Sequence, residues 1–278
     1  MFTVESMKAF RQANRILFRG SNVLYLLPHP RLRSWISNYT ITFPQAEAMS
    51  EQYTVIPHGC ATLVYACDTR EIKSNLFGPI TKPSCVGHDA NSASLLFIVE
   101  FQPAGYYAFS KIPQFELTDL LIPFGNLDSA FDRDIEQSIE GTTDLDDFIT
   151  AVDTLFFSHL KDLSFPQEFS AANDLILKNN GVLSIKDLSQ NVYYSERHLS
   201  RTFNKYVGTS TKSFSRLVRI NKALHILRRP NISIIRAGME SGFYDDPHFI
   251  RDFTSICGIT PQKYRDHMSD FYSELAKF

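Results

Sequence analysis

A segment of about twenty residues occurs twice in this chain, and the two copies lie 50 positions apart. SERHLSRTFNKYVGTSTKSF occupies 195–214, and DDPHFIRDFTSICGITPQKY occupies 245–264. The same class of residue recurs at the positions of the histidine, the arginine, the phenylalanine and the glycine. Self-similarity at a fixed period is typical of a duplicated supersecondary unit. The C-terminal part of the chain is therefore expected to contain one small motif twice.

Each copy has the features of one amphipathic helix. In the first copy, Ser195 is a helix-capping residue and Gly208 is the kind of residue that ends a helix. Leu199 and Phe203 are four positions apart, so they share one face of the helix and point inward. Arg201 lies between them and points away from that face.

The second copy repeats this pattern with Asp245 or Asp246 as its cap. Phe249 and Phe253 form its inward pair. Pro247 falls in the first turn, where a missing N–H costs nothing, so this proline is expected to begin a helix rather than end one.

A shorter helical segment precedes each copy, at 184–192 and at 233–241. Two short helices joined by a tight turn, with polar residues outward on the second, form a helix-turn-helix. The second helices are expected at about 195–206 and 246–256. Between the units, 210–229 has helical spacing, and about 17 residues span about 26 Å. With helix widths added, the outer helices can lie about 34 Å apart, which is one turn of B-DNA.

Charge is divided unevenly along the chain. Residues 1–167 carry 12 Lys and Arg against 19 Asp and Glu, a net charge of −7. Residues 168–278 carry 16 against 11, a net charge of +5, and the repeat region 182–266 carries 14 against 7. A basic region favours a polyanionic partner, and phosphate contacts supply most sequence-independent affinity for DNA.

This C-terminal region resembles the DNA-binding domain of the AraC/XylS family of transcriptional regulators. The resemblance covers about 85 residues, 183–265, and includes SERHLSRTF, DPHFIRDF and the ending CGITPQKYR. It implies base-reading positions in both second helices and phosphate contacts nearby. The implied base-reading residues are Arg197, Ser200 and Arg201, followed by Asp246, Pro247, His248 and Arg251. The implied phosphate contacts are Lys205, Lys212 and Arg216.

The second unit departs from the family pattern. Ala237-Gly238 stands where the family has a large apolar residue before a small one, and Thr254 stands where a lysine is common. The small second residue still allows close helix crossing, whereas the threonine removes one phosphate contact. Asp246 and Pro247 also stand where relatives often have neutral hydrogen-bonding residues. We therefore expect the second unit to read few bases, and Arg197 and Arg201 of the first unit to carry more of the specificity.

The first half of the chain is expected to be mainly β. The runs 52–67 and 93–102 are rich in β-branched and aromatic residues and are bounded by turn signals. From about 128 the pattern becomes helical, and 144–160 carries one wide apolar stripe. We expect a sensor or dimerisation domain at 1–163, a linker at 164–170 and a DNA-binding domain at 171–278.

VIPHGCATLVY and VEFQPAGYYAFSKIP resemble a sensor domain that precedes this DNA-binding domain in some family members. That resemblance implies a cupin-like β-barrel, followed by helices for packing or dimerisation, and it names no ligand. The expected fold is thus an N-terminal mainly-β, cupin-like barrel with following helices and a C-terminal all-α tandem helix-turn-helix domain. The stripe at 144–160 is interpreted as core, with a dimer seam as the alternative.

A cupin-like, metal-dependent enzyme with an appended DNA-binding domain is the alternative function. It would need a metal site in the first domain, but His58 and His88 lack ligand spacing, and no nucleophile–base motif is present. We expect no catalytic residue, no cofactor and no metal. Cys60 and Cys85 are expected to be small buried residues.

The sequence therefore predicts a DNA-binding transcriptional regulator that is not an enzyme. Its expected partner is double-stranded DNA, and an unidentified small-molecule effector and a second copy of the chain are left open. A third hypothesis makes the N-terminal domain an oligomerisation module without a ligand. No signal peptide or membrane segment is recognised, so we expect a cytoplasmic protein. The operator, the regulated genes and the choice between activation and repression stay open.

Overall fold

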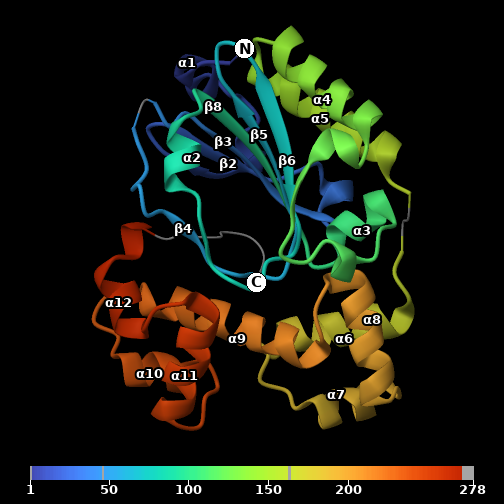
Figure 1. Cartoon of the computed structure of the whole chain (residues 1–278), viewed down its shortest axis with the longest axis vertical. Helices are drawn as coiled ribbons and strands as arrows, with labels where there is room; N and C mark the ends of the chain where they lie inside the picture. Colours follow the sequence, from blue (N-terminus) through green and yellow to red (C-terminus); the bar gives the residue numbers. More distant parts are fainter. Residues whose placement is uncertain (1, 46, 162–163, 271–278) are drawn as a thin grey trace.

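A seven-stranded antiparallel sheet organises the N-terminal half (Figure 1). The computed structural model describes residues 2–45, 47–161 and 164–270. The strand order is β1-β2-β3-β8-β5-β6-β9. The strands are β1 (Ile16–Arg19), β2 (Val23–Leu26), β3 (Ile36–Thr42), β5 (Thr62–Cys67), β6 (Ile72–Phe77), β8 (Leu95–Phe101) and β9 (Leu121–Pro123). The predicted β-rich half followed by a helical half is confirmed.

The sheet is open rather than closed into a barrel. Among the described residues, β1 and β9 are its two edges and do not pair with each other. Both edges are poor templates for closure, because β1 carries an irregularity between Ile16 and Phe18 and β9 is a three-residue strand that contains Pro123. The expected cupin-like barrel is therefore not confirmed, whereas the mainly-β domain is.

Helices α4 (Ser129–Gly141) and α5 (Leu145–His159) pack against this sheet. Asp144 caps α5 by accepting from the N–H groups of Asp146 and Asp147. The predicted apolar stripe is core: its fully buried members are Leu145, Phe148, Ile149, Val152 and Phe156. Because these side chains are enclosed with the strands, they are not available for a dimer seam.

A buried ion pair fastens α5 to the sheet. Asp153 accepts from Arg15 Nη1 at 2.7 Å and from the Tyr39 hydroxyl at 3.0 Å. Burial raises the pKa of Tyr39, and the neighbouring carboxylate adds to that rise. All three side chains are nearly inaccessible, so the network links the N-terminal segment, β3 and α5 inside the core.

Short elements complete this domain. They are α1 (Val4–Lys8), α2 (Gly87–Asn91), α3 (Gly105–Ser110) and a two-stranded sheet of β4 (Thr54–Val55) with β7 (Ser84–Cys85). Cys60 is buried as expected, but Cys85 is exposed. The expectation for Cys85 is wrong because it lies in a two-residue strand outside the main sheet.

The C-terminal half is built from seven helices within the described residues. They are α6 (Gln167–Lys178), α7 (Ile185–Val192), α8 (Glu196–Val207), α9 (Thr211–Leu227), α10 (Ile234–Glu240), α11 (Asp246–Cys257) and α12 (Pro261–Asp266). Helix α9 runs between two groups of helices, with α6–α8 at one end and α10–α12 at the other (Figure 1). Each group has its own hydrophobic core, and α9 contributes side chains to both.

Part of the predicted linker is helical. Helix α6 begins at Gln167, directly after Pro166, so residues 167–170 are helical. Phe169 is buried in the core of the first helical group. The expected domain end at residue 163 lies outside the described residues. No helix among those that are described is long and apolar enough to cross a membrane.

Candidate nucleic-acid interface

The first helix-turn-helix consists of α7 and α8. Ser184 caps α7 by accepting from the Asp187 N–H, and Ser195 caps α8 by accepting from the His198 N–H at 3.2 Å. Helix α8 ends at Gly208, whose φ of 87° lies in the left-handed region that glycine adopts without strain. The cap and the stop that the sequence predicted for α8 are both confirmed.

The second helix-turn-helix consists of α10 and α11. Asp245, not Asp246, caps α11, because its carboxylate accepts from the His248 N–H at 2.7 Å. Pro247 lies in the first turn of α11, as predicted. The Asp246 side chain is thereby left for the outward face.

Buried phenylalanine and leucine pairs hold both second helices in place. Leu199 and Phe203 of α8 and Phe249 and Phe253 of α11 are completely buried. At the α10–α11 crossing, a Cβ on Gly238 would lie only 2.7 Å from the Phe249 ring. The close crossing that was expected at this small residue is therefore present.

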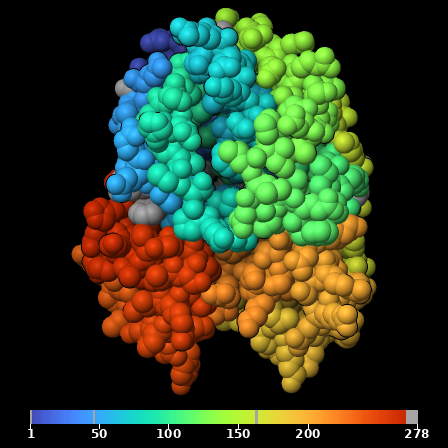
Figure 2. Space-filling view, viewed as in Figure 1, coloured from blue at the N-terminus to red at the C-terminus, as the bar shows by residue number. Residues whose placement is uncertain are grey.

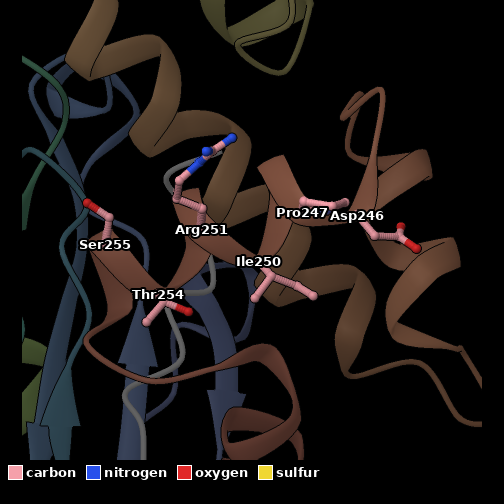
Figure 3. A pocket seen from close by; sticks show the side chains of 6 residues that line it. All are labelled: Asp246, Pro247, Ile250, Arg251, Thr254 and Ser255. Atoms are coloured by element: carbon pink, nitrogen blue, oxygen red, sulfur yellow. The ribbon is translucent and has the colours of Figure 1, made fainter.

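The outward face of α11 is a shallow, open hollow (Figure 3). The residues that line it are Asp246, Pro247, Ile250, Arg251, Thr254 and Ser255. Three predicted residues, Asp246, Pro247 and Arg251, are thus brought together on one surface. Arg251 is exposed and extends from the helix, away from Ile250 (Figure 3).

Ile250 belongs to this face, but sequence reasoning missed it. Its side chain is 41% exposed, between Pro247 and Thr254 on the helix. The repeat held the signal, because Ile250 lies 50 positions after Ser200, which was selected in the first unit. The polar-to-apolar change concealed the equivalence.

The corresponding face of α8 carries more positive charge. Arg197 and Arg201 are exposed, and Ser200 is half-buried. Lys212 is exposed in the first turn of α9. These four residues lie where the sequence placed them, at the surface of the first unit and its connection to α9.

Three other predicted DNA contacts, His248, Arg216 and Lys205, already have partners within the protein. His248 is not among the residues that line the hollow; its Nε2 lies 3.5 Å from Asp252 and its ring edge faces Phe243. Arg216 donates to both oxygens of Asp252, at 2.9 and 3.1 Å. Sequence spacing could not reveal the Arg216–Asp252 contact, because these residues are 36 positions apart, whereas His248 and Asp252 are four apart on one helix.

Lys205, which the sequence predicts as a phosphate contact, points from α8 toward the N-terminal domain. Its ammonium lies 5.5 Å from the centre of the Tyr107 ring in α3 and 5.1 Å from that of Tyr206. Hydrogen bonding to Tyr107 raises the pKa of Lys205, so the side chain is charged at neutral pH. The first unit and the N-terminal domain therefore meet at the C-terminal end of α8.

Further contacts join the N-terminal domain to the helical half (Figure 2). The Thr118 hydroxyl donates to the Gly208 carbonyl at 2.9 Å. Asn221 of α9 donates to the Pro57 carbonyl at 3.0 Å, and Gly59 lies against Leu217. The N-terminal domain thus touches both α8 and the helix that connects the two units.

The donor groups of the described residues do not form a metal centre. No three His, Cys, Asp or Glu side chains among them are grouped to hold an ion. His58 is buried, and His88 lies on the surface with its Nδ1 3.2 Å from Glu51.

Two family models match the chain. The helix-turn-helix domain model matches residues 188–267. A second model, described as a domain of unknown function (DUF6597), matches residues 25–123 and thus covers most of the sheet.

The curated relatives that match the helical half are transcriptional regulators. The HTH-type transcriptional regulator ArgR of Pseudomonas aeruginosa is 31% identical over 84 residues, which are 30% of this chain and 26% of the relative. The HTH-type transcriptional activator AarP of Providencia stuartii is 32% identical over 83 residues, which are 30% of this chain and 62% of the relative. The matches span less than two thirds of either relative.

Solved structures match the same domain and, more remotely, most of the chain. An AraC-type DNA-binding domain-containing transcriptional regulator from Chromobacterium violaceum is 31% identical, with 36% of this chain and 89% of that chain covered and a TM-score of 0.33. ToxT from Vibrio cholerae, bound to an unsaturated fatty acid, is 14% identical, with 88% of this chain and 93% of that chain covered and a TM-score of 0.38. Residues 188–267 therefore form a helix-turn-helix domain of the AraC type, similar to those of these transcriptional regulators.

Proposed function

We propose that this regulator binds specific double-stranded DNA by inserting α8 and α11 into successive major grooves. The observation that carries the proposal is the pair of outward faces, each with an exposed arginine at the same place in the repeat. Arg201 and Arg251 lie 50 residues apart on helices that are capped, stopped and anchored alike.

The two faces favour different base edges. Arg197, Arg201 and Arg251 can each donate two hydrogen bonds to the O6 and N7 of guanine, and Ser200 can contact either kind of edge. Asp246 can accept from the amino group of cytosine, while Pro247 offers an apolar contact to a thymine methyl group. Ile250 extends that apolar surface. The second half-site is therefore proposed to be richer in thymine than the first.

Phosphate contacts are proposed chiefly for Lys212 on the DNA-binding half. Lys205 and Arg216 can take part only by exchanging their present partners, Tyr107 and Asp252, for a phosphate. His248 has the smallest proposed role, because it faces Asp252 and lies outside the hollow.

The N-terminal domain is proposed to transmit an effector or assembly signal through its contact with α8. Tyr107 holds Lys205, and Thr118 holds the end of the same helix. A small molecule or a second copy that repositions α3 and the segment that follows it, up to Thr118, would change both contacts. A thermal-shift screen tests the effector, because a ligand of the native state raises the midpoint by an amount set by its concentration and affinity.

The DNA proposal is tested by measuring, with fluorescence anisotropy at fixed salt, how tightly the full-length protein binds selected DNA. Arg201→Ala and Arg251→Ala should each cost about 1–3 kcal/mol. Arg229→Ala is the control, because it removes an equal charge from a residue that pairs with Glu240 outside the proposed reading faces. Unchanged affinity in both reading-helix variants would contradict the proposal.

A further inference from the structure

One half-buried arginine in the helical half joins the two helix-turn-helix units. Arg219 lies on α9, and both its Nε and its Nη2 donate to the Gly181 carbonyl, at 3.3 and 2.8 Å. Gly181 lies in the turn between α6 and α7, directly before the first helix-turn-helix and within the α6–α8 group that packs with it. The same guanidinium lies 5.1 Å from the centre of the Phe243 ring, in the turn of the second unit.

The turns that Arg219 joins also touch each other directly. A Cβ on Gly242 would overlap the side chain of Val182, so these residues are in contact across the units. Gly181 packs on the backbone of α9 at Ser215 without room for a side chain. Its φ of 69° is in the left-handed region, so both the backbone conformation and the lack of room for a side chain favour glycine at this position.

The chemistry of this contact depends on a guanidinium. A planar guanidinium can direct two N–H groups at one carbonyl while its flat face covers an aromatic ring. Burial lowers the pKa of Arg219, which still remains charged, so the contact places a cation in a partly desolvated location. Such a placement is unfavourable unless both partners are present.

The two helical groups have separate hydrophobic cores, so the Arg219 contact can affect how the two units are oriented relative to each other. Phe214 and Val218 of α9 belong to the core of the first unit, whereas Leu217 and Ile220 belong to that of the second. Each unit can therefore hold together by itself, and their mutual orientation depends on α9 and on contacts that cross between the turns. Arg219 occupies that crossing.

We propose that Arg219 is a positioning residue that sets the required spacing between the two DNA half-sites. It does so by holding the Gly181 turn of one unit against the Phe243 turn of the other. The proposal rests on the proposed function, in which α8 and α11 each read one half-site. One base pair inserted between half-sites moves the second by about 3.4 Å and about 35° around the helix axis. Protein with fixed units cannot follow that change, whereas protein with released units can.

The test selects DNA with full-length protein from a library whose random segment exceeds two helical turns. Wild-type protein should enrich two half-site motifs at one spacing. Arg219→Ala should enrich the same motifs at two or more spacings. Arg219→Lys should behave similarly, because it keeps the charge but loses the paired N–H groups. Arg229→Ala should retain the single spacing.

Binding assays on the selected DNA test the same proposal through the ratio of the dissociation constants at the altered and the selected spacing. A one-base-pair change of spacing should weaken wild-type binding at least about tenfold, because the contacts of one unit are misplaced. The penalty in both Arg219 variants should be several times smaller. Circular dichroism and thermal melting show which variants are folded. If Arg219→Ala does not fold, the spacing penalty of Arg219→Lys is the deciding measurement.

A single spacing shared by the wild type and the folded Arg219 variants would overturn the proposal and assign the spacing to α9 alone. Enrichment of one half-site by the wild type would also overturn it. If the wild type enriched no DNA, the proposed function would fail first, and the role of Arg219 would fall with it.

Discussion

Replacing Asp153 with asparagine should strongly destabilise the N-terminal domain. The Arg15 side chain is 8% exposed and that of Asp153 is 6% exposed, so the ion pair between them is shielded from water. Asparagine keeps the shape and can still accept from Tyr39, but it leaves the guanidinium without a countercharge. Breaking a buried pair in this way costs about 3–5 kcal/mol.

The single tryptophan makes this loss measurable. Trp35 is 8% exposed in the core of the N-terminal domain, so its fluorescence reports that domain during urea unfolding. With a slope of about 2 kcal/mol per molar urea, Asp153→Asn should lower the midpoint by about 2 M. Asp144→Asn is the control: it breaks an exposed pair with Arg11 but keeps a good helix cap, so its cost should stay below about 1 kcal/mol.

A second change separates charge from packing. Arg15→Met, Asp153→Leu and Tyr39→Phe together remove both charges and the buried hydroxyl that donates to Asp153, and similar replacements of buried pairs are often neutral or stabilising. The triple variant should therefore recover most of the stability that Asp153→Asn loses. A loss below about 1 kcal/mol in Asp153→Asn would refute the reasoning, since it would mean that water already reaches Arg15.

Three further predictions concern the helical half. Gly242→Ala should destabilise it by about 1–3 kcal/mol in thermal unfolding, because φ is 83° and the new methyl group would meet Val182; an unchanged melting temperature would contradict this packing. Tyr107→Ala should free Lys205 for phosphate and steepen the salt dependence of DNA binding by about one unit of slope, and adding Lys205→Ala should abolish that increase. An unchanged slope in Tyr107→Ala would exclude this competition. Ile250→Asn should reduce selectivity at one thymine-preferring position by about 1–3 kcal/mol in competition binding, and equal losses on all sequences would show that Ile250 has no reading role.

Local rules predicted the helical elements well, because their signals lie within a few residues. Ser195, Gly208 and Pro247 each determine a helix end through a neighbouring backbone group. The repeat added what single motifs lack, namely the equivalence of Arg201 with Arg251. Helical geometry predicted Asp246, Pro247 and Arg251 on the outward face of α11, but it missed Ile250 and included His248, which lies outside the hollow.

Partners that are distant in sequence could not be predicted in the same way. Arg216 was expected at phosphate but pairs with Asp252, and Lys205 was expected there but meets Tyr107. Each side chain has the charge that DNA requires, and only the fold shows that another group holds it. The same limit applies to the sheet, where strand composition indicates β structure but not whether its edges close.

Methylation interference on the selected DNA tests the central claim most directly. A methyl group on guanine N7 blocks an arginine in the major groove at that base. The account predicts two clusters of interference about 10 base pairs apart. Replacing both Arg197 and Arg201 with alanine should remove one cluster, and Arg251→Ala should remove the other. A single cluster, or two clusters that survive these substitutions, would contradict the claim that α8 and α11 read successive major grooves.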